Sequence, residues 1–308
     1  MALLLPGLAH AGDIATIQYR EANGAASVMV EGGATVETPF AIASVGKTMT
    51  SVAVLRLVED GMLKLDETVG GYLPDAILSG LPQSSRVTLR QLLTMTSGLP
   101  DYLDDSYLTD ALDDPDTVQE PHTALTYAFD QAPLFEPGTD FNYSNTNYVL
   151  LGLIIEAVTG ETYAAAMERL VLRPAGMTGA FVFGSVPLPE SFPTGHEDGQ
   201  QYRDYYAHEG FGDGGVIASA ADVAKFYHAL FTKQSLLSPA MMRELLNDPL
   251  GVGYGMGIEL EGPIVGHSGG DLGFSSDVRL DRDSGKLAIM LSASANSDSL
   301  WTYEALEP

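Results

Sequence analysis

The sequence predicts an α+β protein, in which an antiparallel sheet is flanked by helices and a mainly helical subdomain is inserted between its strands. Two observations support this class. Segments of strand-like composition lie near the start of the chain and over its end, whereas the segments between them are apolar with helical periodicity. Because strands and helices do not alternate singly along the chain, separate layers are favoured over a doubly wound parallel sheet.

The first strands are predicted to form a hairpin. Residues 14–19 and 26–31 have strand-like composition, and Asn23-Gly24 lies between them. An Asn-Gly pair in this position favours a tight turn, and Gly32-Gly33 marks the end of the second strand.

A buried helix is predicted over residues 44–59. Its apolar residues occupy most of the helix circumference, and Gly61 provides a stop signal. Ser44 therefore lies near the N-terminus of a helix that is packed on most sides.

Further helices are predicted over residues 88–97, 147–158 and 220–231. Thr88 can cap the first of them and Gly98 can close it, because threonine and glycine favour these two ends of a helix. Two long segments, 99–141 and 179–215, are instead rich in Asp, Pro, Gly and Tyr, which is typical of surface loops that line a cleft.

The chain returns to strands at its end. Residues 257–260, 274–280 and 287–292 have strand-like composition, and Asp283-Ser284-Gly285 is predicted to be the hairpin turn between the last two strands.

Composition limits the partners and the chemistry. The chain has 308 residues, of which 45% are hydrophobic, so it can bury a large core. Its 41 acidic and 15 basic residues give a formal net charge of -26, so we expect neither nucleic acid nor anionic membranes as partners. The chain has no cysteine, which excludes disulfides, thiol nucleophiles and thiolate metal sites.

The N-terminus carries a signal-like segment. Residues 2–8 are apolar and end in Ala9-His10-Ala11, which is typical of the end of a secretory signal with its cleavage site. We therefore expect a periplasmic or secreted protein. A truncated or misassigned start is the competing interpretation, and it leaves a cytoplasmic location open. No other apolar run is long enough to cross a bilayer, so we expect no membrane span.

Ser44 and Lys47 form the first candidate pair for chemistry. Residues three apart on a helix lie one above the other, so the amine of Lys47 can reach the hydroxyl of Ser44. The helix N-terminus also favours a developing negative charge. For Lys47 to act as a base, its pKa of about 10.4 in water must fall through burial or a neighbouring cation. The alternative is an ordinary surface lysine on the first turn of a helix.

Tyr143, Ser144 and Asn145 form the second candidate group, in a loop just before an apolar helix. The phenol of Tyr143 can carry a proton once a protonated lysine makes its anion more accessible. The amide of Asn145 offers donors and an acceptor to a substrate. The competing interpretation is that Ser144 or Asn145 simply caps the helix.

His267, Ser268 and Gly269 form the third group. Residues 266–270 also match the G-x-S-x-G pattern of a nucleophile elbow, but that fold needs an acid and a histidine after the serine, and His267 is the last histidine of the chain. The remaining histidines show no metal-ligand spacing, so we expect no metal and no cofactor.

In this order, the three groups resemble the motifs of the serine β-lactamase and penicillin-binding protein superfamily, and most closely its branch of class C-type β-lactamases, D-alanyl-D-alanine carboxypeptidases and β-lactamase-like esterases. The resemblance covers roughly residues 36 to 295 and includes further landmarks at residues 38–47, 92–100, 135–145, 213–219 and 266–269.

The resemblance implies a β-lactamase/transpeptidase-like fold and a role for each site residue. Ser44 would be the acylated nucleophile, and Lys47 and Tyr143 would share its proton. Asn145, His267, Ser268 and Gly269 would contact the substrate. The backbone N–H groups of Ser44 and Gly270 would form the oxyanion hole.

The resemblance also implies the substrate, a small-molecule ester, peptide or β-lactam. Many β-lactamases of the superfamily have lysine where this chain has His267, and histidine is only partly charged near neutrality. We therefore expect a carboxypeptidase-like or esterase-like serine hydrolase. A β-lactamase proper and a penicillin-binding or sensor homologue without turnover are the alternatives, and the oligomeric state is left open.

These expectations give a single catalytic domain over residues 1–308. Its sheet subdomain would comprise residues 12–70 and 245–308, and its helical and loop subdomain residues 71–244. Compared with the family pattern, little chain precedes Ile14 and the C-terminal helix is short, so we expect an exposed sheet edge that favours dimerisation or aggregation.

Overall fold

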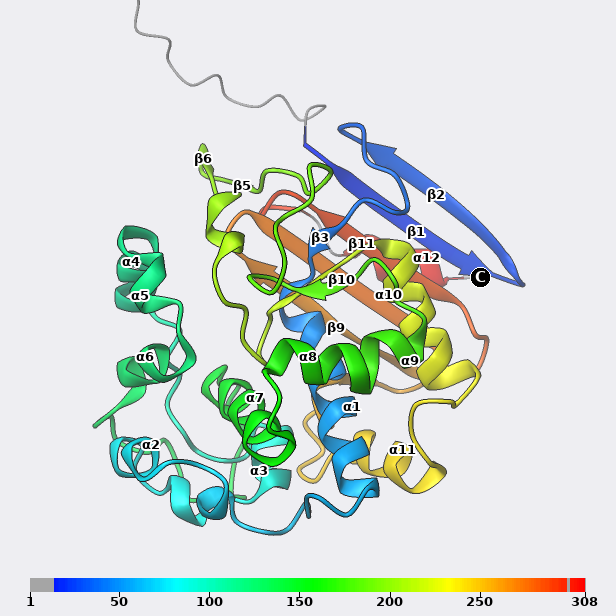
Figure 1. Ribbon diagram of the computed structural model, residues 1–308. Helices are drawn as coiled ribbons and strands as arrows, with labels where there is room; N and C mark the ends of the chain where they lie inside the picture. Colours follow the sequence, from blue (N-terminus) through cyan, green and yellow to red (C-terminus); the bar gives the residue numbers. More distant parts are fainter. Residues whose placement is uncertain (1–13, 298–299, 308) are drawn as a thin grey trace, which may run out of the picture.

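The computed structural model describes residues 14–297 and 300–307, and the signal-like segment of residues 2–11 lies outside them. Its main sheet has six antiparallel strands in the order β2-β1-β11-β10-β9-β8 (Figure 1). The strands are β1 (Thr16–Ala22), β2 (Ala25–Glu31), β8 (Glu259–Glu261), β9 (Ile264–Asp271), β10 (Phe274–Asp281) and β11 (Leu287–Ser292). Strands from both ends of the chain thus share one sheet, which confirms the predicted α+β class.

Two hairpins have the predicted turns. β1 pairs with β2 across Asn23-Gly24, and both turn residues have a positive φ, as the tight turn requires. β10 pairs with β11 across the turn that contains Gly285. β9 was not predicted as a strand, because its glycines lower strand propensity. It is held by pairing with β8 on one side and β10 on the other.

A small second sheet joins the start and middle of the chain. Its strands are β3 (Phe40–Ala41), β7 (Val216–Ala218) and β4 (Phe181–Val182), in that order. β5 (His196–Glu197) and β6 (Gln200–Gln201) form a separate hairpin.

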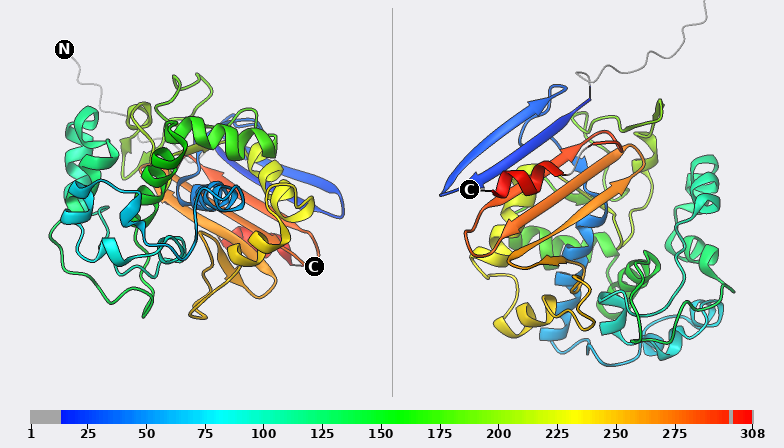
Figure 2. Two further views of the ribbon diagram at one scale, coloured as in Figure 1. Left: turned by 60° about the horizontal axis from the view of Figure 1, so that its bottom comes forward. Right: turned by 180° about the vertical axis from the view of Figure 1, so that it is seen from behind.

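Helix α1 (Gly46–Glu59) lies in the interior, between the sheet and the other helices (Figure 1, Figure 2). Met49, Val52 and Leu55 on it are fully buried, in agreement with the predicted buried helix. On the opposite face of the sheet, Ala305 and Leu306 of α12 (Leu300–Leu306) pack against Ala288 of β11 (Figure 2). The sheet is therefore covered on both faces near β10 and β11.

The remaining helices form most of the middle of the chain. They are α2 (Asp75–Gly80), α3 (Leu89–Leu93), α4 (Asp105–Asp113), α5 (Pro115–Val118), α6 (Pro121–Leu125), α7 (Thr146–Thr159), α8 (Tyr163–Met167), α9 (Arg173–Ala175), α10 (Ala220–Tyr227) and α11 (Pro239–Leu245). Short 3₁₀ and π-helical turns join several of them. The boundary predicted between two subdomains stays a prediction.

Three predicted segments differ from the structure. The segment 179–215, expected to be loop, contains the short strands β4, β5 and β6. The segment 99–141, expected to be loop, contains α4, α5 and α6, each of which starts at a local signal: Asp104 caps α4, and proline opens α5 and α6. Helix α3 begins at the predicted cap, Thr88, which forms a capping box with Gln91. It ends at Leu93 and not at residue 97, because Met95 adopts a left-handed conformation with φ 57°.

The edge strand β2 is exposed along its whole length. Val28, Met29 and Val30 are 39%, 58% and 48% exposed, and they alternate between the two faces of the sheet. Among residues 14–297 and 300–307, β2 pairs only with β1, so this edge presents apolar side chains beside backbone groups that have no strand partner there.

In the part of the chain that the structure describes, no single helix is long and apolar enough to cross a membrane. Helix α7 and the segment Tyr163–Ala175 meet the length and composition requirement only as a pair, which is bent by 81°.

Candidate active site

Ser44 lies in the 3₁₀ turn η2 (Ala43–Val45), which leads directly into α1. The preceding residue, Ala43, has φ 46°, a conformation that is strained for a residue with a Cβ. On the other side of the turn, the Ser276 hydroxyl of β10 donates a hydrogen bond of 2.7 Å to the Ile42 carbonyl. The nucleophile candidate is thus fixed by the sheet as well as by the helix.

Lys47 is fully buried one turn into the helix. Its Nζ lies 2.9 Å from Ser44 Oγ and 2.8 Å from Asn145 Oδ1, and it also donates to the Asp213 carbonyl oxygen. An ammonium group satisfies all three contacts as a donor. A neutral amine would donate to the two carbonyl oxygens and present its lone pair to the Ser44 hydroxyl, so the geometry suits both protonation states.

Asn145 precedes α7 and lies between Lys47 and Asp101. Its Oδ1 accepts from Lys47, and its Nδ2 donates to Asp101 Oδ2 at 3.0 Å. Its backbone N–H also donates to Asp101, at 3.0 Å. The structure therefore gives Asn145 an additional role that the sequence did not indicate, the orientation of Lys47. Its contact with substrate stays a prediction.

Tyr143 lies on the other side of Lys47. The centroid of its ring is 5.1 Å from Lys47 Nζ, and its hydroxyl is buried without a hydrogen-bond partner among the residues that the structure describes. Tyr143 and Ser44 line the same cavity. A phenol in this place can exchange a proton with a group bound above Ser44.

Strand β9 brings the third predicted group to Ser44. A Cβ on Gly269 would lie 2.7 Å from the Ile42 carbonyl oxygen and 3.0 Å from Ser44 N, so only glycine lets the strand approach this closely. Gly270 follows, opposite Ser275 of β10. The oxyanion hole formed by the N–H groups of Ser44 and Gly270 stays a prediction, and both residues line the same cavity.

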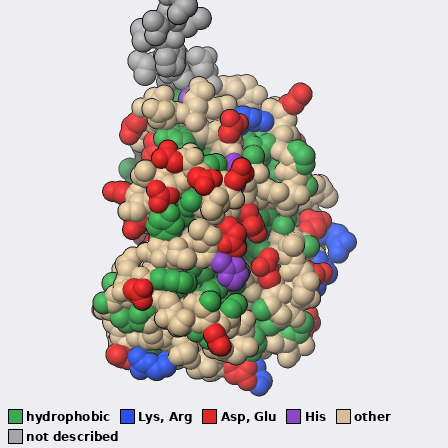
Figure 3. All heavy atoms as spheres, turned by 60° about the vertical axis from the view of Figure 1, so that its left-hand side comes forward, with side chains coloured by type: hydrophobic (Ala, Val, Ile, Leu, Met, Phe, Trp, Pro, Cys, Tyr) green, Lys and Arg blue, Asp and Glu red, His purple; other side chains and the backbone are tan. Residues whose placement is uncertain are grey.

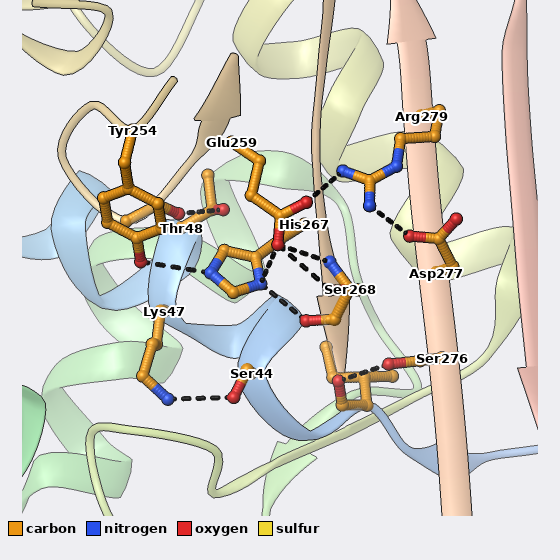
Figure 4. A network of polar contacts seen from close by, with 12 residues as sticks. Ser44, Lys47, Thr48, Tyr254, Glu259, His267, Ser268, Ser276, Asp277 and Arg279 are labelled. Carbon is orange, nitrogen blue, oxygen red and sulfur yellow. Dashed lines mark hydrogen bonds and ion pairs between the residues drawn. The ribbon is translucent and has the colours of Figure 1, made fainter. Parts of the chain in front are cut away.

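His267 is buried, and both ring nitrogens have partners (Figure 4). Its Nδ1 faces the Ser268 carbonyl oxygen at 2.5 Å, which requires Nδ1 to carry the proton, so Nε2 accepts from the Tyr254 hydroxyl at 3.1 Å. Burial lowers the pKa of His267 to about 4, although Glu259 acts in the opposite direction. The imidazole is therefore neutral near pH 7.

A chain of charged groups continues behind His267 (Figure 4). Glu259 accepts from Ser268 Oγ at 3.0 Å and from Arg279 at 2.6 Å. Arg279 also forms an ion pair of 2.7 Å with Asp277, which accepts from Thr302 of α12. The charge of Arg279 is thus balanced by two carboxylates, and no lysine or arginine lines the described part of this cavity.

Two cavities open beside Ser44. One, of about 490 Å³, is lined by Tyr143, His267 and Ser268, and the other, of about 50 Å³, by Asn145, Asp213 and Asp271. Ser44 and Gly270 line both. A group that reacts at Ser44 can therefore extend to two chemically different sides.

The structure brings all eight predicted site residues together, and it adds four that the sequence analysis missed: Asp101, Asp213, Tyr254 and Glu259. A signal existed for two of them, because Asp101 directly follows the landmark 92–100 and Asp213 begins the landmark 213–219. Tyr254 and Glu259 had none. In the described ranges, 14–297 and 300–307, no group of three or more His, Asp or Glu side chains could hold a metal ion.

The sequence matches the family model described as Beta-lactamase over residues 9–306. Penicillin-binding protein 4* of Bacillus subtilis is 30% identical over 92% of this chain and 66% of its own length. Protein flp of Staphylococcus aureus is 36% identical over a match that covers 46% of this chain and 27% of that protein. The chain thus spans less than two thirds of the length of these curated relatives.

Solved structures match the fold over almost the whole chain. A D-stereospecific amidohydrolase from Streptomyces sp. superimposes with a TM-score of 0.83 at 25% identity, covering 94% of this chain and 93% of the other. A penicillin-binding protein from Bacillus halodurans gives a TM-score of 0.81 at 26% identity, covering 94% and 95%.

Proposed function

Because this chain belongs to the β-lactamase family, whose model matches nearly all of it, we propose that it is a serine hydrolase that forms an acyl-enzyme on Ser44. The observation that carries the proposal is the contact of 2.9 Å between Ser44 Oγ and the buried amine of Lys47. A weak hydroxyl nucleophile needs an adjacent group that accepts its proton.

The proposed reaction has two halves. Ser44 Oγ attacks the carbonyl carbon of an ester or amide while its proton passes to Lys47, and the backbone N–H groups of Ser44 and Gly270 stabilise the oxyanion. The bond to the leaving group then breaks, and the leaving group takes a proton through Tyr143. In the second half, water attacks the acyl-enzyme, and the same groups return the proton to Ser44 Oγ.

The surroundings of His267 favour the esterase or amidase arm of this proposal. A β-lactam and a D-alanyl-D-alanine peptide both carry a carboxylate on the leaving side of the scissile bond. On that side, His267 is neutral, and the charge of Arg279 is taken up by Glu259 and Asp277, so these groups offer no unpaired cation to a substrate carboxylate. Esters and amides with an uncharged leaving group need no such cation. The similarity to a D-stereospecific amidohydrolase supports an amide substrate.

The test combines covalent labelling with a substrate panel. A fluorophosphonate should label Ser44, located by peptide mass, and Ser44→Ala should abolish both labelling and turnover. Short-chain p-nitrophenyl esters and simple amides should be cleaved with higher kcat/KM than D-alanyl-D-alanine peptides or cephalosporins at neutral pH. Labelling of another residue would refute the nucleophile, and efficient cephalosporin hydrolysis would refute the substrate class.

A second candidate is a penicillin-binding protein that acylates without turnover, and the similarity to penicillin-binding protein 4* favours it. A fluorescent penicillin distinguishes the two. A permanent adduct on Ser44, with no hydrolysis of any ester or amide, would indicate the binding protein.

A further inference from the structure

The smaller cavity beside Ser44 has an unusual lining. The acidic side chains Asp213 and Asp271, with the more exposed Glu209, lie in it together with aromatic rings such as those of Tyr102 and Phe211. Its volume of about 50 Å³ is several times what one water molecule needs, so it can accept a small polar group of a ligand.

The two carboxylates have neutral hydrogen-bond donors. Asp213 Oδ2 accepts from the Tyr102 hydroxyl at 2.8 Å, and Asp271 Oδ1 accepts from the Leu272 backbone N–H at 2.8 Å. The nearby amine of Lys47 is directed to the backbone carbonyl of Asp213 instead. The carboxylates of Asp213 and Asp271 therefore share one partly closed space, with Glu209 at its more exposed side, and no lysine or arginine among the described residues lines it.

This arrangement disfavours the charged form of both groups. Burial raises the pKa of Asp213, and burial together with the charge of Asp213 raises the pKa of Asp271 to about 6. A cation placed between the carboxylates would relieve their repulsion and replace the lost solvation.

An independent observation comes from Gln119, which follows α5 and lines the same cavity. The side chain is only 4% exposed, and its Oε1 has no hydrogen-bond partner among the residues that the structure describes. A buried acceptor without a donor is unfavourable, because it has lost its hydrogen bonds to water. The carboxylates of Asp213 and Asp271 and the amide oxygen of Gln119 thus give the cavity three acceptors for a donor group of a ligand.

The position of the cavity identifies the part of the substrate that it meets. Tyr143, the proposed proton donor to the leaving group, lines the other cavity together with His267. Ser44 and Gly270, which would hold the scissile carbonyl, lie between the two. The acidic cavity therefore receives the acyl part of the substrate, close to its carbonyl carbon.

We propose that this cavity binds a primary ammonium group on the acyl part of the substrate, and that the preferred substrates are esters or amides of amino acids with a free amino group. The three N–H bonds of an ammonium match the three acceptors, and its charge matches the carboxylates. The inference rests on the proposed acylation of Ser44.

The negative charge of the outer surface also favours a cationic ligand. The formal net charge of the chain is -26, and Figure 3 shows Asp and Glu side chains spread over the face that carries α4 and α5. A negative surface of this kind raises the local concentration of cationic substrates.

The test compares substrates that differ only in the amino group. Alanine p-nitroanilide, as both enantiomers, and propionyl p-nitroanilide have nearly the same size, but only the first carries an ammonium. We expect at least one alanine enantiomer to be cleaved with kcat/KM about 10-fold or more above the propionyl compound. N-acetylation of alanine p-nitroanilide should remove the preference.

Variants then assign the preference to the cavity. Asp271→Asn and Gln119→Leu should each lower the ratio of the two kcat/KM values, Asp271→Asn by about 10-fold. Asp198→Asn, an exposed aspartate outside the cavity, should leave the ratio unchanged.

The outcomes distinguish a failure of the ammonium site from a failure of the proposed acylation of Ser44. If a fluorophosphonate labels Ser44 and the propionyl compound is cleaved as fast as both alanine enantiomers, the ammonium site is refuted while the acyl-enzyme stands. If Ser44 is not labelled and no substrate is cleaved, the proposed function fails first. A preference that persists undiminished in both cavity variants also refutes the ammonium site.

Discussion

Lys47 Nζ donates a hydrogen bond to Asn145 Oδ1 at 2.8 Å, although the two residues lie 98 positions apart. Lys47 belongs to α1, and Asn145 directly precedes α7. The amide fixes the direction of the amine toward Ser44, and Asp101 in turn fixes the amide through two hydrogen bonds. The site therefore depends on a neutral acceptor beside the lysine.

Replacing that acceptor by a charge should inactivate the protein. In Asn145→Asp, a carboxylate beside Lys47 would stabilise the ammonium form and would also repel Asp101, so the amine would accept the Ser44 proton less readily. We expect kcat/KM for a p-nitrophenyl ester to fall about 100-fold or more, as for loss of a general base. The exposed Asn247→Asp is the matched control, and equal activities would contradict the assignment.

The close approach of β9 to the nucleophile should be sensitive to one methyl group. In Gly269→Ala, the Cβ would meet the Ile42 carbonyl oxygen and Ser44 N, both backbone atoms that cannot move independently of the nucleophile. Because small displacements of reacting groups cost about 100-fold in rate, we expect a loss of at least that size in kcat with a folded protein by circular dichroism. Gly71→Ala, where a Cβ meets nothing within 4 Å, should be active.

His267 should make stability depend on pH. Its pKa is about 4 in the folded protein and about 6.5 unfolded, so between these values the unfolded state binds the extra proton and the free energy of unfolding falls as the pH decreases. The loss should reach about 2 kcal/mol at about pH 5. The lowered pKa of Glu259 acts in the same sense, whereas the raised pKa values of Asp271 and Asp277 act in the opposite sense.

The difference between wild type and His267→Gln isolates this contribution, measured by urea unfolding at about pH 5 and about pH 7. The variant should lose less stability on acidification than the wild type. The exposed His122→Gln should behave as the wild type does, and an identical pH dependence for His267→Gln would show that folding does not lower the pKa of this imidazole.

The exposed edge of the sheet should promote self-association. In the described part of the chain, β2 pairs only with β1, and its Val28, Met29 and Val30 are exposed. We expect light scattering to show an apparent mass that rises above 32.7 kDa with concentration. Met29→Lys should reduce the rise, because a charged side chain blocks strand addition, whereas Leu134→Lys, at an exposed loop position, should not. A constant monomer mass for the wild type would contradict this expectation.

Local signals were sufficient for much of the fold. Asn23-Gly24 predicted the first hairpin and Thr88 the start of α3, because each residue type favours one backbone conformation. β9 could not be predicted in the same way. Its glycines are unfavourable in a strand, and pairing with neighbours on both sides, together with the close contact at Ser44, holds it in place.

In the candidate site, too, some residues could be predicted from local sequence and others could not. The spacing of Ser44 and Lys47 is local, so a helix brings them together, and the motif around Asn145 could be recognised from the chain. The partners that orient these groups come from segments far away in sequence. Asp213 contacts Lys47 and Tyr254 contacts His267 only because the tertiary fold brings them there, and neither residue type is distinctive by itself.

Amine-reactive supports should immobilise this protein without blocking Ser44. The chain has only five lysines, and Lys47 is fully enclosed, so its amine is sheltered from a reagent bound to a bead. The other four are Lys64, Lys225, Lys233 and Lys286, and among the residues that the structure describes, none of these four lines either cavity beside Ser44. Coupling through them would therefore leave the entrance to the nucleophile open, and a reusable solid-phase preparation becomes practical.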